Sequence, residues 1–280
     1  MAKGFSLHIG LNKVDANRYG GWSGTLAGCV NDAHDMQAVA EKLGYTSKVL
    51  LDEQATSKAV IAAIKGIAGQ MAPQDIFFGS YSGHGGQVPD TNGDESTREP
   101  GEIGGEEDEY DETWVLYDRQ LVDDELWALW SHFPAGSRVV VFSDSCHSGT
   151  VSREPPAFLG GTPQPVSRRM PLDVEERDYA DHKAEYDEIQ RDTPPRAASE
   201  VKATIALISG CQDNQTSADG DGNGLFTSKL LQVWQDGSFR GSLKTLRNRT
   251  SKLMPVTQSP NFYVVGAANP AFLKAQALRI

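Results

Sequence analysis

Two glycine-flanked segments carry the side chains best suited to chemistry. Residues 75–86 (DIFFGSYSGHGG) place His84 just after an apolar run, and residues 138–149 (RVVVFSDSCHSG) place Cys146 just after another. A thiolate can attack a carbonyl carbon, while a nearby imidazole activates the thiol and later protonates the leaving amine. The pair therefore predicts nucleophilic acyl transfer with His84 and Cys146 as a catalytic dyad.

Each segment taken alone also fits a structural role, since a histidine can end a strand and a small cysteine can pack in a core. The two residues are 62 positions apart (146 − 84), so a fold must bring two strand ends together to pair them. Main-chain N–H groups of Gly85 and Cys146 would then donate hydrogen bonds to the developing oxyanion. Their matching positions after apolar runs favour the catalytic interpretation.

A sheet is expected to position these side chains. Short β-rich apolar runs occupy residues 5–12, 48–51, 75–82, 138–143 and 204–209, with a last candidate strand at 261–265. Apolar residues at helical spacing occur at 32–43, 57–68, 123–131, 225–234 and 242–253. This alternation predicts an α/β fold with a mostly parallel sheet covered by helices, in which functional groups gather beyond the carboxyl ends of the strands.

Two segments interrupt the alternation. Residues 88–118 contain a dense acidic run without apolar periodicity, which predicts a long loop after the third strand. Residues 152–201 are rich in Pro, Arg, Asp and Glu, and this composition predicts an exposed, flexible linker. One structural domain is expected, divided into a catalytic region at 1–151, the linker, and a second region at 202–280.

Composition excludes several classes of function. A formal net charge of −12 argues against nucleic-acid binding and favours cationic partners. No apolar run is long enough to span a bilayer, and the first residues lack a signal-peptide pattern, so a cytoplasmic protein without a membrane partner is expected. Three cysteines without C-x-x-C spacing predict neither a disulfide framework nor a zinc site. We expect a monomer whose chemistry needs no cofactor.

Three motifs resemble those of metacaspases and bacterial orthocaspases. They are S-G-H-G at 82–85, D-S-C-H-S-G at 144–149 and S-G-C-Q-D-N-Q-T-S-A-D at 209–219. The resemblance extends over nearly the whole chain and implies a caspase-like three-layer α/β/α sandwich, with 1–151 as the large-subunit region and 202–280 as the small-subunit region. The segment around Cys146 departs from the Q-A-C-x-G signature of caspases, which favours metacaspase-like specificity.

The resemblance also implies a substrate pocket that includes Cys29, Asp32 and Ser82. Asp144, two residues before Cys146, would lie on the same side of its strand as the nucleophile. Two carboxylates in one pocket favour a guanidinium or an ammonium and repel an acidic side chain. Asp32 could equally cap a helix, and Asp144 could equally accept backbone hydrogen bonds in a turn. Cleavage of protein or peptide substrates after Arg or Lys, rather than Asp, is the resulting expectation.

The acidic residues leave open whether the chain binds calcium. The positions that match the family's calcium ligands are Asp111, Asp123 and Asp124. Oxygen ligands in a loop suit this ion, but the family's fourth position falls on Arg153, followed by Glu154, so a solvated acidic run is an equal alternative. The motif D-G-D-G-N-G at 219–224 is not an EF-hand, because Leu230 stands where the twelfth-position Glu belongs.

The linker at 152–201 holds candidate processing sites. Its basic residues include Arg168, Arg169, Lys183, Arg191 and Arg196, of which Arg168, Arg169 and Arg196 are the processing candidates. Self-cleavage or an upstream activating protease would cut there, whereas the alternative is an inert solvated linker. A catalytically silent caspase-like module for binding or calcium sensing is the main alternative to an enzyme, and the intact pair of His84 and Cys146 argues against it.

Overall fold

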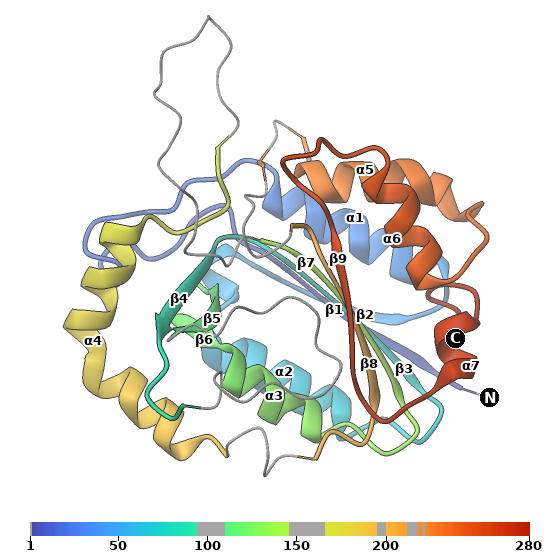
Figure 1. The fold of residues 1–280 in the computed structure, drawn as a ribbon, viewed down its shortest axis with the longest axis horizontal. Helices are drawn as coiled ribbons and strands as arrows, with labels where there is room; N and C mark the ends of the chain where they lie inside the picture. Colours follow the sequence, from blue (N-terminus) through green and yellow to red (C-terminus); the bar gives the residue numbers. More distant parts are fainter. Residues whose placement is uncertain (1, 94–109, 146–165, 195–199, 212–217, 220–221) are drawn as a thin grey trace, which may run out of the picture.

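A six-stranded sheet crosses the molecule in the order β2-β1-β3-β7-β8-β9 (Figure 1). The computed structural model describes residues 2–93, 110–145, 166–194, 200–211, 218–219 and 222–280. The strands are β1 (Gly4–Gly10), β2 (Thr46–Leu51), β3 (Ile76–Ser82), β7 (Arg138–Asp144), β8 (Thr204–Ser209) and β9 (Asn261–Gly266). The first five in this order are parallel, and β9 is antiparallel to β8. All six predicted strands are present, with ends that agree or differ by at most two residues.

Helices cover both faces of this sheet. One face carries α1 (Cys29–Lys42), α5 (Leu225–Trp234) and α6 (Leu243–Ser251), and the other carries α2 (Ser57–Ala68) and α3 (Asp123–Ser131), while α7 (Pro270–Lys274) lies near the C-terminus. Alternation along the strands sends Phe77 and Val139 toward α2 and α3, and Phe78 and Phe142 toward α1 and α5. The predicted three-layer α/β/α sandwich is confirmed, and the five predicted helices are present.

A second, smaller sheet lies within the segment predicted to be a long loop. It is antiparallel and consists of β4 (Gly85–Pro89), β5 (Tyr110–Val115) and β6 (Gln120–Val122). The prediction for 88–118 is therefore wrong at both ends of the segment, and residues 94–109 lie outside the described residues. Asp111 and Thr113 are polar yet buried in β5, so an apolar pattern could not reveal this strand.

Helix α4 (Leu172–Asp192) lies inside the segment predicted to be a flexible linker. Its sequence is mostly charged, but Val174 and Tyr186 are buried, and Tyr186 packs with Val88 of β4 and Val122 of β6. Pairs such as Lys183–Asp187 (2.6 Å) support its exposed side. The linker prediction is wrong for this helix, because a few buried contacts hold an otherwise polar element.

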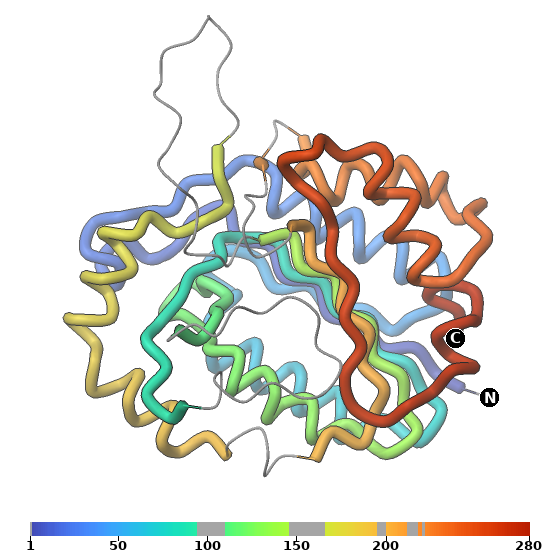
Figure 2. The backbone as a smooth tube through the Cα atoms, in the orientation of Figure 1, coloured from blue at the N-terminus to red at the C-terminus, as the bar shows by residue number. Residues whose placement is uncertain are grey.

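The carboxyl ends of the central strands meet at one edge of the main sheet. Gly10, Ser82 and Asp144 are register partners on β1, β3 and β7. Figure 2 shows the chain after β1 running beside the segment that enters α4, beyond this edge. Among the residues described, no helix combines the length and the apolar character that crossing a membrane requires.

Candidate active site

His84 lies two residues beyond β3 and is buried, with 5% of its surface exposed. Its Nε2 atom is 3.1 Å from the Gly24 carbonyl oxygen, and its ring is tilted against Trp22 with centroids 4.8 Å apart. Gly24 has φ +55°, and a Cβ there would come within 3.2 Å of the imidazole, so glycine permits this approach.

The surroundings of His84 favour a neutral imidazole. Burial lowers the pKa of His84 to about 4, although the Gly24 carbonyl acts in the opposite direction. Nε2 must carry the proton to donate to Gly24, so Nδ1 keeps its lone pair. Nδ1 has no hydrogen-bond partner within the described part of the chain. A neutral histidine held this way can accept a proton from a nucleophile.

Cys146 lies outside the described residues, so the pairing of the dyad stays a prediction. The structure does place the residues leading to the two candidates side by side, since Ser82 and Asp144 are register partners on adjacent strands. Gly85, the other predicted oxyanion donor, uses its N–H to donate to the carbonyl oxygen of Arg168 at 3.0 Å.

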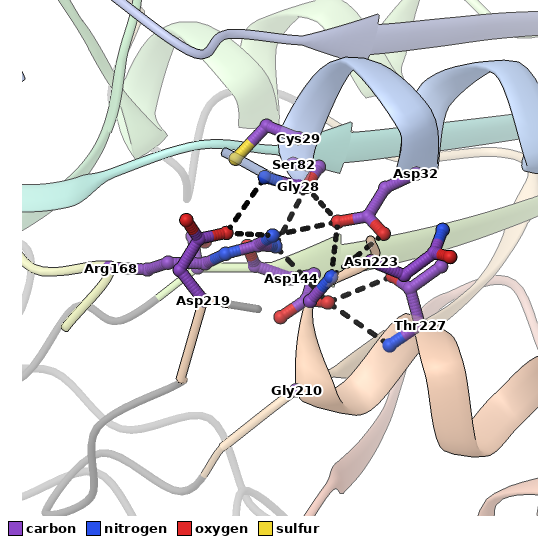
Figure 3. Close-up of polar contacts among 12 residues, drawn as sticks. Gly28, Cys29, Asp32, Ser82, Asp144, Arg168, Gly210, Asp219, Asn223 and Thr227 are labelled. Carbon is purple, nitrogen blue, oxygen red and sulfur yellow. Dashed lines mark hydrogen bonds and ion pairs between the residues drawn. The ribbon is translucent and has the colours of Figure 1, made fainter. Parts of the chain in front are cut away.

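Three carboxylates and one hydroxyl surround the guanidinium of Arg168 (Figure 3). We call this group, Asp32, Ser82, Asp144 and Asp219, the carboxylate pocket. Arg168 Nη2 is 2.8 Å from Asp32 Oδ2 and 2.9 Å from Asp219 Oδ1. Nη1 is 3.1 Å from Asp144 Oδ2 and donates to Ser82 Oγ at 2.7 Å. Arg168 is 0% exposed, so a full positive charge is buried here with acidic partners on several sides.

Two helix starts hold the acidic groups in place. Asp144 Oδ2 accepts hydrogen bonds from the Thr227 N–H (3.0 Å) and Oγ1 (2.8 Å) in the first turn of α5. Asp32, in the first turn of α1, accepts from Ser82 Oγ (2.6 Å) and from the Gly224 N–H (3.0 Å). Asp144 therefore accepts a backbone hydrogen bond, here at a helix start rather than in a turn, and also pairs with a cation. Asp32 is not a helix cap, because Gly28 is the N-cap residue of α1.

Asp219 is the residue of the pocket that sequence reasoning missed. Its carboxylate accepts from the N–H groups of Ala27 (2.6 Å) and Gly28 (3.1 Å), just before α1. The motif at 209–219 ends on it, yet the sequence analysis weighed it only as part of an EF-hand. Neither Gly24 nor Thr227 was predicted as a site residue, because the contacts of both with the site depend on tertiary structure.

The pocket shifts the ionisation of its members. Burial and the nearby Asp144 carboxylate raise the pKa of Asp32 to about 6, although Arg168 opposes this shift. For Asp219, burial is outweighed by hydrogen bonds from Ala27 and Arg168, which lower its pKa. Burial raises the pKa of the neighbouring Cys29 thiol to about 12, so Cys29 stays protonated and lines the site without serving as a nucleophile.

The three predicted calcium ligands also come together. Asp111 of β5 and Asp123 and Asp124 of α3 each offer an oxygen, and these oxygens lie within 4.8 Å of one another. Asp111 and Asp124 are buried, and Asn92 donates to Asp124 at 2.6 Å. Clustered carboxylate oxygens fit a hard divalent cation. Arg153 and Glu154, on which the fourth ligand depends, lie outside the described residues.

The processing candidates differ in their surroundings. Arg168 fills the carboxylate pocket, whereas Arg169 pairs with Glu175 of α4 at 3.0 Å. Arg196 lies outside the described residues.

Comparison with known families agrees with the fold and the motifs. The family model described as "Caspase domain" matches residues 12–272. Proteins named Metacaspase-1 are similar: the Kluyveromyces lactis protein is 30% identical over 91% of this chain, and the Mycosarcoma maydis protein is 29% identical over 76%. The chain spans 64% and 57% of these two relatives.

Solved structures are similar as well. A crystal structure of a protein from Geobacter sulfurreducens has 45% sequence identity and a TM-score of 0.84, and the match covers 98% of this chain and 97% of that one. Caspase-1 from Spodoptera frugiperda has 12% identity and a TM-score of 0.56, over 99% of this chain and 90% of that one, which supports the fold alone.

Proposed function

Since the chain belongs to the caspase-domain family of peptidases, we propose that it is a cysteine endopeptidase that cuts proteins after Arg or Lys. The observation that carries this proposal is the carboxylate pocket, which already holds an arginine side chain with good geometry. The same proposal describes the protein as a cytoplasmic monomer. Its partners would be protein substrates, and it would bind neither nucleic acid nor a membrane.

The proposed mechanism assigns each main step to a residue of this chain. The neutral imidazole of His84, oriented by the Gly24 carbonyl, takes the proton of the Cys146 thiol. The thiolate attacks the substrate carbonyl carbon, and the Gly85 N–H stabilises the oxyanion together with the Cys146 N–H. His84 then protonates the leaving amine, and water hydrolyses the acyl-enzyme to release the acid and restore the thiol.

The pocket geometry supports a preference for Arg over Lys. Nη1 and Nη2 of Arg168 reach different carboxylates, which a planar guanidinium can do and a single ammonium cannot match. An aspartate side chain would bring a further negative charge into a group that is already acidic, so its binding is disfavoured.

Matched peptides test this proposal. Peptides that differ only in Arg, Lys or Asp before a fluorogenic leaving group are expected to be turned over in the order Arg, Lys, Asp. Asp144→Ala should lower kcat/KM for the Arg peptide about 100-fold or more, because a buried charge partner is lost. Cys146→Ala should abolish turnover. Efficient turnover of the Asp peptide alone would contradict the proposal.

The cluster of Asp111, Asp123 and Asp124 supports a second proposal, that the chain binds calcium. These oxygens would hold the ion, which would neutralise their charge and link β5 to α3. We expect calorimetry to detect calcium binding to the wild type, and Asp123→Asn to weaken it at least tenfold, while Asp236→Asn, an exposed site, leaves it unchanged. Absence of calcium binding to the wild type would contradict this proposal, and a chelator would then leave the activity unchanged.

We further propose that cutting within 152–201 activates the enzyme, by its own action or by an upstream protease. The candidates remain Arg168, Arg169 and Arg196. A Cys146→Ala protein that fragments at the same bonds during purification would exclude self-processing.

A further inference from the structure

Main-chain hydrogen bonds hold residues 166–170 on both sides of Arg168. On the preceding side, Ser167 forms an antiparallel bridge with Ala218, and the Asp219 N–H donates to the Val166 carbonyl at 2.9 Å. On the following side, Arg169 forms a parallel bridge with Gly85 at the start of β4, and the Met170 N–H donates to the Gly85 carbonyl at 2.8 Å. This strand addition is how a cleft binds an extended peptide.

The carbonyl group of Arg168 is held by a hydrogen bond as well. Its oxygen accepts a hydrogen bond of 3.0 Å from the Gly85 N–H. The proposed mechanism assigns this N–H group to stabilising the oxyanion. The side chain of the same residue fills the carboxylate pocket. One residue therefore presents its side chain, its carbonyl oxygen and its flanking main chain as a bound substrate would.

We propose that residues 166–170 are this chain's own bound substrate, that Arg168–Arg169 is the bond it hydrolyses in itself, and that Arg168 excludes other arginine substrates until it leaves the pocket. This inference rests on the proposed peptidase function.

The structure distinguishes Arg168 from the other candidates. The Arg169 guanidinium is paired with Glu175, outside the carboxylate pocket. A cut after Arg196 would leave Arg168 attached on both sides and still in the pocket. Cleavage at Arg168–Arg169 separates residue 168 from α4, which is anchored by the buried Tyr186.

The reaction is a hydrolysis and needs no partner other than water. The Cys146 thiolate displaces the amine of Arg169, which takes the proton held by His84, and a thioester forms at the Arg168 carbonyl carbon. Water then splits the thioester. The products are a carboxylate at Arg168, an amino group at Arg169 and the restored thiol.

A time course of the purified wild-type chain tests the bond and its intramolecular cleavage. Intact mass and N-terminal sequencing should show a first cut that leaves Arg169 as the new N-terminus, with a first-order rate that is unchanged over a tenfold range of protein concentration. Arg169→Gln should be cut at the same bond. A Cys146→Ala chain mixed with active wild type should stay uncut there for at least ten wild-type half-times, because its Arg168 is held in its own pocket.

Other results of this time course would overturn the inference. They are a first cut at another bond, a rate that scales with concentration, or equally fast cleavage of the Cys146→Ala chain by added wild type. An uncut wild type that turns over the Arg peptide would also overturn it while leaving the proposed function standing. No turnover of the Arg peptide by any form, cut or uncut, would instead remove the proposed function.

A binding measurement tests the exclusion of other ligands without catalysis. The probe is acetyl-Val-Ser-Arg with a free carboxylate, and all proteins carry Cys146→Ala. Adding Arg168→Gln should tighten binding at least tenfold by calorimetry, whereas Arg191→Gln, at an exposed site on α4, should leave it unchanged. Equal affinity in a folded Arg168→Gln protein, checked by near-UV circular dichroism, would overturn the exclusion. The time course uses proteins in which the carboxylate pocket and Arg168 are unchanged. It therefore tests the inference even if the Arg168→Gln protein does not fold.

Discussion

Buried charge is the central feature at the scale of single residues. A guanidinium that is 0% exposed would be strongly destabilising without partners, and Arg168 has carboxylates from three segments that are distant in sequence. Asp219 joins this pocket to the start of α1 through the Ala27 and Gly28 N–H groups. It thus acts on both the charge of the site and its shape.

Replacing Asp219 should reveal that role. We expect Asp219→Asn to lower kcat/KM for an Arg peptide by about 10- to 100-fold, mainly through KM, because a hydrogen bond to a charged group contributes about 1.5–3 kcal/mol. Steady-state kinetics would measure it. Asp236→Asn, at an exposed position, is the matched control. Equal kinetics for Asp219→Asn and the wild type would show that two carboxylates suffice.

At the scale of elements, the starts of α1 and α5 form two walls of the site. Gly224 immediately precedes α5, and its N–H donates to Asp32, which ties the two helices together. A Cβ at Gly224 would lie 2.5 Å from the Cζ, Nη1 and Nη2 atoms of Arg168. The absence of a side chain there is what leaves room for a guanidinium.

Filling that space should close the pocket. The backbone of Gly224 (φ −56°, ψ 152°) is accessible to alanine, so the effect of Gly224→Ala is steric rather than conformational. We expect kcat/KM for Arg peptides to fall about 100-fold, since displacing a bound group by about 1 Å is enough for such a loss. In Gly222→Ala, the added Cβ has no neighbouring atom within 4 Å, and activity should be retained. A similar loss in both variants would indicate a general loop effect.

At the scale of the whole molecule, the central sheet buries a histidine that takes no part in the site. His8 of β1 is 0% exposed, and its Nδ1 is 2.8 Å from Ser80 Oγ on β3. Burial lowers the pKa of His8 to about 3. Below pH 6.5 the unfolded chain binds a proton at this position that the folded chain does not. The stability present at pH 7 is therefore lost as the pH falls from 6.5 toward 3.

Removing this titration should change how stability depends on pH. At pH 5 the unfolded state gains about 2 kcal/mol from protonation of His8, at 1.36 kcal/mol per pH unit. The difference in unfolding free energy between the wild type and His8→Gln should therefore shift by about 2 kcal/mol in favour of the variant between pH 7 and pH 5. Urea unfolding at both pH values measures it, with His34→Gln, an exposed site on α1, as the control. A difference that is independent of pH would contradict the assignment to His8.

Features set by local pattern could be predicted from the sequence. Apolar runs and helical spacing predicted the six strands of the main sheet and five helices, and the resemblance of three motifs led to the confirmed family and sandwich. Positions after predicted strands led to His84 and Cys146 as candidates, and Asp144 followed from its position two residues before Cys146. Polar elements escaped this reasoning: β5 buries Asp111 and Thr113, and α4 is held by a few contacts such as those of Tyr186.

Tertiary structure alone decided which distant residues share the carboxylate pocket. Arg168 and Asp32 are 136 positions apart, and Asp219 reaches them from a third segment. The sequence alone does not distinguish one linker arginine from another. In the folded chain, strand ends and two helix starts meet around Arg168 and surround it with acidic groups. A buried charge is stable only where its partners converge, and convergence is a property of the folded chain.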